Sequence, residues 1–465
     1  MKNIRYILVA LAVLVCSQTS MAQTAVSSYF LDGTLYNSRL NPAMKAERGY
    51  LSLGVGNVSL RLKGNVGMSN FLFPRGEDKL ATFMSGSVTA DEFLSGMPDA
   101  ARLGYNFDET LMALGFRLFG GYFSFGVSLH SSTTFSMPKG IFEFAKKGVQ
   151  NGGYSFSGLE LNTMNYAATT VGYSHELFKG FRVGVNAKYL LGLAHANVLV
   201  DKLNLEFSDQ RWMLESHAQA QAALLCETRV QKDENNVITG AELALGNEDL
   251  INLLPSDGYA IDLGFVYDMK AIIPGLKISA SVVDLGHIKW RYMMTGESRD
   301  AKVEYTGLGD IDYNNAEDVV NAELERLADD AMKLTEFTYN GSSEVKTGLN
   351  TTVYLGAEYN IPFFKRLSVG ALYSKCISPF ESNQWTETRG FVNFAPFKWL
   401  ELSANYGRGT YGTVMGWMFN FHPWGINMFV GSDYMITRVT PQYIPIDNLN
   451  AHITFGLNLA LGRRK

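Results

Sequence analysis

The chain has few cysteines, few prolines and few charged residues. Of its 465 residues only three are cysteines and 12 are prolines, and charged residues make up 18%. So few cysteines exclude a disulfide framework and a cysteine-based metal site. A formal charge of -5 without a basic run in the body of the chain excludes an electrostatic surface for nucleic acid. The hydrophobic fraction of 46% excludes disorder for most of the chain.

Long hydrophobic runs are also missing. After Ala22 no stretch approaches the length of ~18 apolar residues that a membrane-spanning helix needs, which excludes an inner-membrane protein built from helices. The apolar stretch at 6–16 is short, follows Lys2 and Arg5, and precedes the small residues Ser20 and Ala22. This order is typical of a secretory signal peptide over 1–22, cleaved after Ala22. We therefore expect an exported protein.

The remaining chain has apolar residues at every second position. The period of two occurs at 181–189, 353–359, 400–406 and 453–461, where the alternate positions are polar or small. Such alternation predicts strands with one apolar and one polar face. A soluble sandwich would show the same pattern, so the lengths of the connections must decide between the two classes.

The connections fall into two groups. Long segments lie near 63–110, 131–163, 201–257 and 291–349, whereas the other connections are short. Short turns at one end, long loops at the other and an even strand count are the plan of an outer-membrane barrel. We therefore predict an all-β fold, a 14-stranded antiparallel transmembrane β-barrel over 50–465. The expected hairpins are 111–119 with 121–130, 164–175 with 181–200, 258–268 with 276–290, 350–360 with 367–377, 386–396 with 399–408, and 412–421 with 426–436, between a first strand near 50–62 and a last near 450–461.

Aromatic residues gather beside the short turns. Amphipathic rings prefer the level of the lipid headgroups, so these residues indicate a girdle at the periplasmic interface. This places the short turns and both mature termini in the periplasm and the protein in the cell outer membrane. The girdle consists of Phe119, Tyr122, Phe178, Phe181, Phe363, Phe364, Phe397, Trp399, Phe421 and Trp424.

Two short motifs suggest a family. Asn41-Pro42-Ala43 stands near the expected mature N-terminus, and Asp-Leu-Gly occurs at both 262–264 and 284–286. Together with the strand count, these motifs resemble those of FadL-type transporters of hydrophobic compounds and their PorV-like relatives. The resemblance implies that residues 23–49 form an N-terminal hatch inside the barrel.

The same resemblance implies two possible functions. The first is FadL-like uptake of hydrophobic compounds such as long-chain fatty acids. The alternative is a PorV-like, non-transporting barrel that acts in protein secretion or surface attachment. The expected partners are outer-membrane lipid, a hydrophobic small molecule or a secreted protein, and the barrel-assembly machinery, because the last strand at 454–461 resembles the signal which that machinery reads.

Patterns of catalytic chemistry are weak. No Gly-x-Ser-x-Gly motif is present, and His175-Glu176 lacks the second histidine of a zinc-protease helix. His130-Ser131 superficially resembles the dyad of an outer-membrane lipase, but the serine spacing and following glycine of that family are missing. We expect no enzyme activity, no cofactor and no metal.

The long loops are the expected place of ligand recognition. The apolar and basic residues there are candidate ligand contacts, although packing between loops would explain them equally well. Periodic apolar residues predict a helix over 314–335, and the segment 140–148 is a shorter candidate. The candidate contacts are Met68, Phe71, Leu72, Phe73, Phe142, Phe144, Lys146 and Lys147.

Overall fold

The computed structural model of the chain describes most residues from Ala25 to Gly462. The described residues are 25–44, 46, 48–54, 57–76, 79–209, 211–224, 228–243, 256–298, 300–306, 325–326, 336–435 and 448–462. The expected signal peptide over 1–22 lies outside them, as does the helix expected over 314–335 apart from two residues. Among these residues, no helix is long and apolar enough to cross a membrane.

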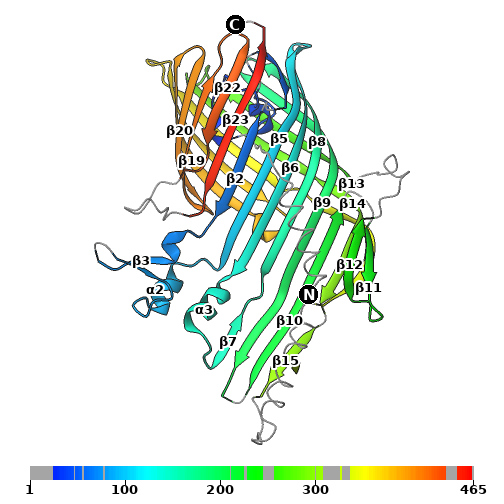
Figure 1. Cartoon of the computed structure of the whole chain (residues 1–465). Coiled ribbons are helices and arrows are strands. Elements are labelled where there is room, and N and C mark those ends of the chain that lie inside the picture. Colours follow the sequence, from blue (N-terminus) through cyan, green and yellow to red (C-terminus); the bar gives the residue numbers. More distant parts are fainter. Residues whose placement is uncertain are drawn as a thin grey trace, which may run out of the picture.

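Within the described part of the chain, 14 antiparallel strands close into a barrel (Figure 1). The first strand is interrupted and consists of β1 and β2, and the eighth consists of β16 and β17. Both β1 and β2 pair with β5 on one side and with the last strand, β23, on the other, which closes the sheet and leaves no edge. The strands are β1 (Gly49–Leu53) with β2 (Val58–Gly64), β5 (Ala100–Leu118), β6 (Gly121–Pro138), β8 (Leu159–Phe178), β9 (Phe181–Phe207), β13 (Ser256–Asp268), β14 (Leu276–Ser298), β16 (Phe337–Gly348) with β17 (Thr351–Asn360), β18 (Leu367–Ile377), β19 (Trp385–Phe397), β20 (Leu400–Gly409), β21 (Gly412–Phe421), β22 (Ile426–Ser432) and β23 (Ala451–Leu461).

The faces of these strands have the polarity of a membrane barrel. Along β23 the exposed positions include Phe455, Leu457 and Leu459, whereas the alternate positions, among them Thr454 and Asn458, are buried. Apolar side chains thus point outward and polar ones point into the lumen. A soluble barrel has the opposite arrangement, so the outer face is suited to hydrocarbon.

The aromatic residues beside the short turns lie mostly on the outer surface. Phe119, Phe363 and Trp424 are exposed, and Phe397 stacks on Trp399 with ring centroids 4.9 Å apart. Tyr122 does not belong to this outer ring. Its position on β6 faces the lumen, where the side chain is buried and its hydroxyl donates to the Arg48 carbonyl oxygen at 2.9 Å.

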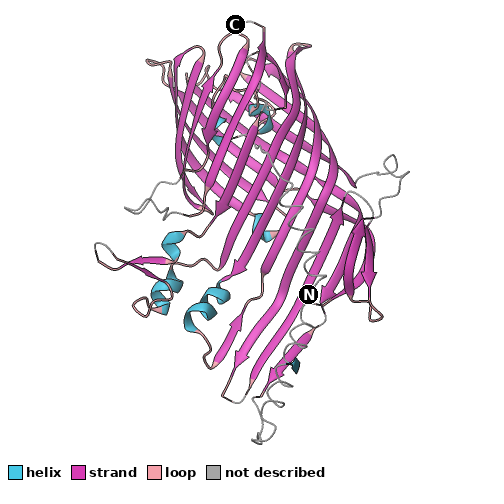
Figure 2. Ribbon diagram, viewed as in Figure 1, coloured by secondary structure: helices cyan, strands magenta, loops and turns pink. Residues whose placement is uncertain are grey.

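The opposite end of the barrel, called here the loop end, is more regular than the sequence suggested. Large parts of 201–257 and 291–349, expected as loops, continue β9, β14 and β16 as strands beyond the apolar band, the belt of exposed apolar side chains around the barrel, and add further strands. Residues 100–110 and 131–138, also expected as loops, belong to β5 and β6. Figure 2 shows the few helices of the loop end beside these strands. The further elements are β3 (Leu72–Pro74), β4 (Leu80–Thr82), α2 (Ala90–Ser95), α3 (Lys139–Lys147), β7 (Gly152–Ser155), β10 (Trp212–Leu224), β11 (Thr228–Lys232), β12 (Ile238–Leu243) and β15 (Ala301–Tyr305).

The N-terminal segment, residues 25–44, lies inside the barrel near the end with the short turns, called here the turn end (Figure 1). It contains two short 3-10 helices, Val26–Ser28 and Asn37–Arg39, and is buried along nearly its whole length. Its hydrogen bonds reach strands on several sides of the wall, so it fills the lumen as a plug.

Candidate functional site

Asn41, Pro42 and Ala43 rest on a flat part of the wall. Gly184 on β9 and Gly264 on β13 are direct partners in the sheet, and a Cβ on either glycine would collide with these three residues. Asn41 Nδ2 donates to the carbonyl oxygens of Phe265 at 3.1 Å and Ala280 at 3.2 Å, and Asn41 Oδ1 accepts from the backbone N–H of Ala43. Two strand glycines therefore provide the space in which the motif docks.

Two buried carboxylates hold other parts of the segment. Asp433 accepts hydrogen bonds from the backbone N–H groups of Val26 at 3.0 Å and Ser27 at 2.8 Å, and it forms an ion pair with Arg61 at 2.8 Å. Glu401 accepts from the backbone N–H of Gly33 at 3.0 Å. Backbone donors of the segment thus face both charges, and the Ser27 hydroxyl also donates to Asp433 Oδ1 at 2.7 Å. These charge-assisted hydrogen bonds fix the path of the segment.

The N-terminal segment separates two spaces in the lumen. A cavity of about 170 Å³ lies on its loop-end side, lined in part by Arg39 and Leu40. A larger space of about 800 Å³ lies at the turn end, lined in part by Phe30 and Asp32. We call the first of these the upper cavity, where upper means toward the loop end, which is drawn at the bottom of Figure 1. The segment blocks a straight path between the two spaces.

The upper cavity carries charge on its wall. Lys188 Nζ lies 2.8 Å from Asp262 Oδ1 and 2.6 Å from Asp284 Oδ1, so one ammonium is shared by two carboxylates. These acids are the first residues of the two Asp-Leu-Gly motifs. The ladder between β13 and β14 shifts register near them, and Asp284 adopts a φ of 58°, which is uncommon for a residue other than glycine. Lys188 gave no signal in the sequence beyond its place on a strand.

The wall has a second irregularity, at the interruption between β1 and β2. Leu51 pairs with Leu459 and Val58 pairs with Phe455, so residues 456–458 of β23 have no ladder partner in the described parts of β1 and β2. Between these two pairs the sequence has six residues on one side, 52–57, and three on the other. The exposed side chains around this interval include Leu53 and Leu457, which places it in the apolar band. We call this interval the wall gap. An interrupted ladder at this level is unusual because hydrocarbon offers no partners to backbone polar groups.

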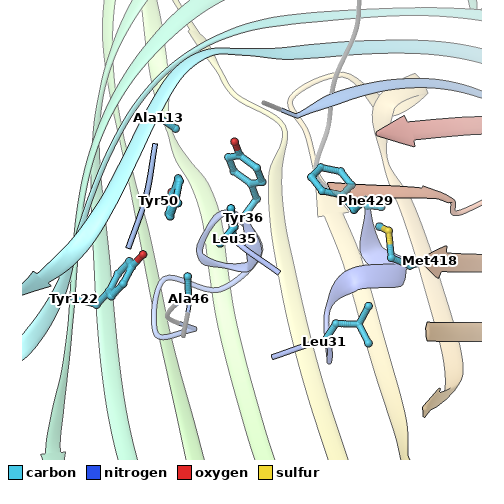
Figure 3. Packing of buried hydrophobic residues seen from close by; sticks show 10 residues of the cluster. Leu31, Leu35, Tyr36, Ala46, Tyr50, Ala113, Tyr122, Met418 and Phe429 are labelled. Atoms are coloured by element: carbon cyan, nitrogen blue, oxygen red, sulfur yellow. The ribbon is translucent and has the colours of Figure 1, made fainter. Parts of the chain in front are cut away.

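Tyr36 of the N-terminal segment covers the wall gap from inside. Its hydroxyl donates to Asn458 Oδ1 at 2.6 Å, and its ring packs against Tyr50 and Phe429, with centroids 5.7 and 6.2 Å away (Figure 3). Burial raises the pKa of Tyr36, so the phenol remains a hydrogen-bond donor. The same cluster includes Ala113 of β5, which lies near the interruption between β1 and β2.

The candidate ligand contacts in the loops lie in two clusters outside the upper cavity. Phe71, Phe73 and Phe142 join a small core around Phe93, and Phe144 stacks on Phe207 with a centroid distance of 6.0 Å. Lys146 Nζ donates to the carbonyl oxygens of Phe83 and Ser85, and Lys147 pairs with Glu143, both within the loops. Leu72 is half-buried and Met68 is 37% exposed.

These features define an outer-membrane β-barrel whose lumen is filled by its own N-terminal segment. Residues 42–433 match a family of unknown function, DUF5723, and the chain belongs to that family. No match was found among the curated proteins.

Among solved structures, the chain is similar to proteins from three bacteria. The Ralstonia pickettii toluene transporter TbuX shares 8% identity over 95% of this chain and 99% of that chain, with a TM-score of 0.42. The Pseudomonas putida toluene transporter TodX shares 10% identity over 95% and 96%, with a TM-score of 0.41. A Pseudomonas aeruginosa FadL homologue shares 9% identity over 95% and 98%, with a TM-score of 0.38.

Proposed function

We propose that this barrel takes up hydrophobic small molecules, such as long-chain fatty acids, and releases them sideways through the wall gap. In this proposal the loop end faces the exterior and the turn end faces the periplasm. The observation that carries the proposal is the wall gap itself, an interrupted ladder within the apolar band beside a plugged lumen. An apolar molecule that leaves there reaches lipid directly and never has to pass the polar contacts of the plug.

The lining of the upper cavity suits a molecule with an apolar body and a polar end. Leu40, Met164 and Val283 contribute apolar surface, and Arg39 and Lys188 contribute charge. Tyr50 lines this space and packs against Tyr36, which covers the wall gap, so in this proposal a shift of the N-terminal segment connects the two. In this proposal the hatch closes the wall gap from inside, and the part that moves is the segment around Tyr36.

Removal of residues 54–56 tests the route. The deletion restores one continuous register with β23, because the interrupted strand is longer than its partner by three residues at this point. It also keeps the lumen-facing and lipid-facing sides unchanged, since Ser52 and Ser59 still point inward. We expect the sealed barrel to lose uptake of a fluorescent fatty acid in cells that lack their own transporter. Deletion of 233–235, an exposed turn between β11 and β12, is the matched control and should leave uptake intact.

Tyr36→Ala tests the gate separately. Removing the ring uncovers the wall gap, so uptake should become faster, whereas Tyr36→Phe removes only the hydrogen bond to Asn458 and should have a smaller effect in the same direction. Folding of each variant is checked by the heat-dependent shift of the barrel on gels. Normal uptake by the folded, sealed barrel would refute the sideways route.

One observation favours a second function. β9 runs for 27 residues and β14 for 23, and with β10, β15 and β16 they extend the barrel into a broad sheet at the loop end (Figure 1). Such a sheet is a suitable platform for a secreted protein in a PorV-like role. Mass spectrometry of the native barrel, purified in mild detergent, distinguishes the two functions. A bound lipid that is lost when 23–49 are deleted supports uptake, and a bound secreted protein without lipid supports the second function.

A further inference from the structure

Three side chains of the upper cavity form a hydrogen-bonded chain that the uptake proposal does not use. Ser128 and His130 lie on the same face of β6, and Asp108 lies directly opposite His130 on β5. Ser128 Oγ is 2.8 Å from His130 Nε2, and His130 Nδ1 is hydrogen-bonded to Asp108 Oδ1. All three residues line the upper cavity.

The order of these contacts is that of a serine nucleophile with its base. The hydroxyl of Ser128 can donate to Nε2, while the Asp108 carboxylate accepts from Nδ1 and so fixes the imidazole tautomer that leaves Nε2 free to take a proton. This arrangement is recognised by geometry and roles, and it occurs on unrelated folds. Ser128 and Asp108 are 3% and 7% exposed, so bulk water competes little for their hydrogen bonds.

Neighbouring side chains hold the three residues Ser128, His130 and Asp108 in position. The ring of Tyr166 stacks on His130 at 4.8 Å with an interplanar angle of 15°, which restricts rotation of the imidazole. Backbone N–H groups of the strands are used in the ladder, so a developing oxyanion must be met by a side chain. Arg39 fits this need: its guanidinium lies beside Gly126, the next residue along the lumen face from Ser128. Within the described part of the chain Arg39 has no ion-pair partner, and its guanidinium lies 5.3 Å from the centroid of the Tyr36 ring.

We propose that Ser128, His130 and Asp108 are the catalytic residues of an ester hydrolase inside the lumen. The substrate class is a carboxylic ester with an apolar acyl chain that enters from the loop end. Ser128 Oγ attacks the acyl carbon while its proton passes to His130 Nε2, and the alcohol leaves with that proton. Water then attacks the acyl-enzyme, gives a proton to His130, and the carboxylic acid departs as Ser128 regains its proton. Arg39 faces the oxyanion in both steps.

The experiment uses the folded barrel in detergent micelles and a fluorophosphonate, which forms a covalent bond to an activated serine oxygen and releases fluoride. Intact-mass and peptide mass spectrometry should place one adduct on Ser128. The same preparation should hydrolyse p-nitrophenyl decanoate. Ser128→Ala should abolish the adduct, and His130→Ala and Asp108→Asn should each lower the hydrolysis rate by at least about 100-fold.

A matched serine serves as the control. Ser136 lies on the same strand and the same face as Ser128 but does not line the upper cavity, so Ser136→Ala should keep both the adduct and the hydrolysis. Arg39→Gln should lower the hydrolysis rate and leave the barrel folded, because Arg39 forms no ion pair in the described part of the chain. A folded wild-type barrel that gains no adduct would overturn the proposal, and so would hydrolysis that persists in Ser128→Ala. Neither result depends on uptake, so the sideways route stands or falls separately.

Discussion

Gly264→Ala should loosen the N-terminal segment, although the change adds only one methyl group. The added Cβ would meet Asn41 Oδ1 and would lie 2.9 Å from Pro42 Cδ and 3.0 Å from Asn41 Cγ. Two of these contacts are with the Asn41 carboxamide, which is buried and held by its own hydrogen bonds, and the third is with the Pro42 ring, so Asn41 and Pro42 must move away from the wall. Movement of Asn41 breaks its hydrogen bonds to the carbonyl oxygens of Phe265 and Ala280.

The expected size follows from those two hydrogen bonds. At about 1 kcal/mol net for each, the docked state loses ~2 kcal/mol relative to the open one. This corresponds to roughly a 30-fold increase in the opening equilibrium of the segment. Hydrogen exchange with mass spectrometry on peptides that cover residues 37–44 measures this equilibrium directly, because the Ala43 amide is protected only while Asn41 stays in place.

A second glycine provides the control. Gly390 on β19 has only one backbone atom, the carbonyl oxygen of Tyr406 at 3.9 Å, near the position of an added Cβ. Alanine is usually better than glycine inside a strand, so Gly390→Ala should leave exchange at 37–44 unchanged or slow it slightly. If Gly264→Ala exchanges at the wild-type rate in a folded barrel, then the two wall glycines are not what docks the motif.

Two further pairs of substitutions test the anchor of the plug and the position of the bilayer. Asp433→Ala removes the carboxylate that pairs with the buried guanidinium of Arg61 and should lower the free energy of unfolding by ~3–5 kcal/mol. Glu381→Gln, which breaks an exposed ion pair at the loop end, should change it little, and urea unfolding in lipid vesicles compares the two. Leu457→Arg places a charge in the apolar band and should destabilise folding by ~2–4 kcal/mol, but Leu461→Arg, nearer the turn end, by only ~0–1 kcal/mol. Equal losses at the last two positions would contradict the placement of the bilayer along β23.

The barrel could be predicted from the sequence because lipid imposes a strict rule on it. Each strand that crosses hydrocarbon needs an apolar side chain at every second position, and the short turns leave no room for other elements. Leu457 and Leu459 on β23 show this rule in its simplest form, since both are exposed and the positions between and beside them are buried. All 14 strands were therefore predicted, and their ends at the short turns lie close to the observed ones. Their other ends were less exact, since β5 and β6 include residues 100–110 and 131–138, which were expected as loop.

Beyond the bilayer the rule no longer applies, and prediction failed there in a specific way. The continuations of β9 and β14 are bounded by water or by other strands, so their polar and apolar residues follow no strict period, and segments such as 201–207 were expected to be loop. The docking of the N-terminal segment was also beyond sequence reasoning in detail. Gly184 and Gly264 lie far apart in the chain, and only the register of β9 with β13 makes them neighbours under Pro42.

The chain of Ser128, His130 and Asp108 depends on an even smaller detail of register. Counted back from the turn, where Leu118 pairs with Gly121, an uninterrupted ladder would place Glu109 opposite His130. The ladder instead shifts by one residue between Thr110 and Met112, and the shift puts Asp108 there. Alternation along β6 already indicates that Ser128 and His130 share a face. The acid that completes the set is chosen by one bulged residue, Leu111, and a bulge in mid-strand has no reliable signature in a single sequence.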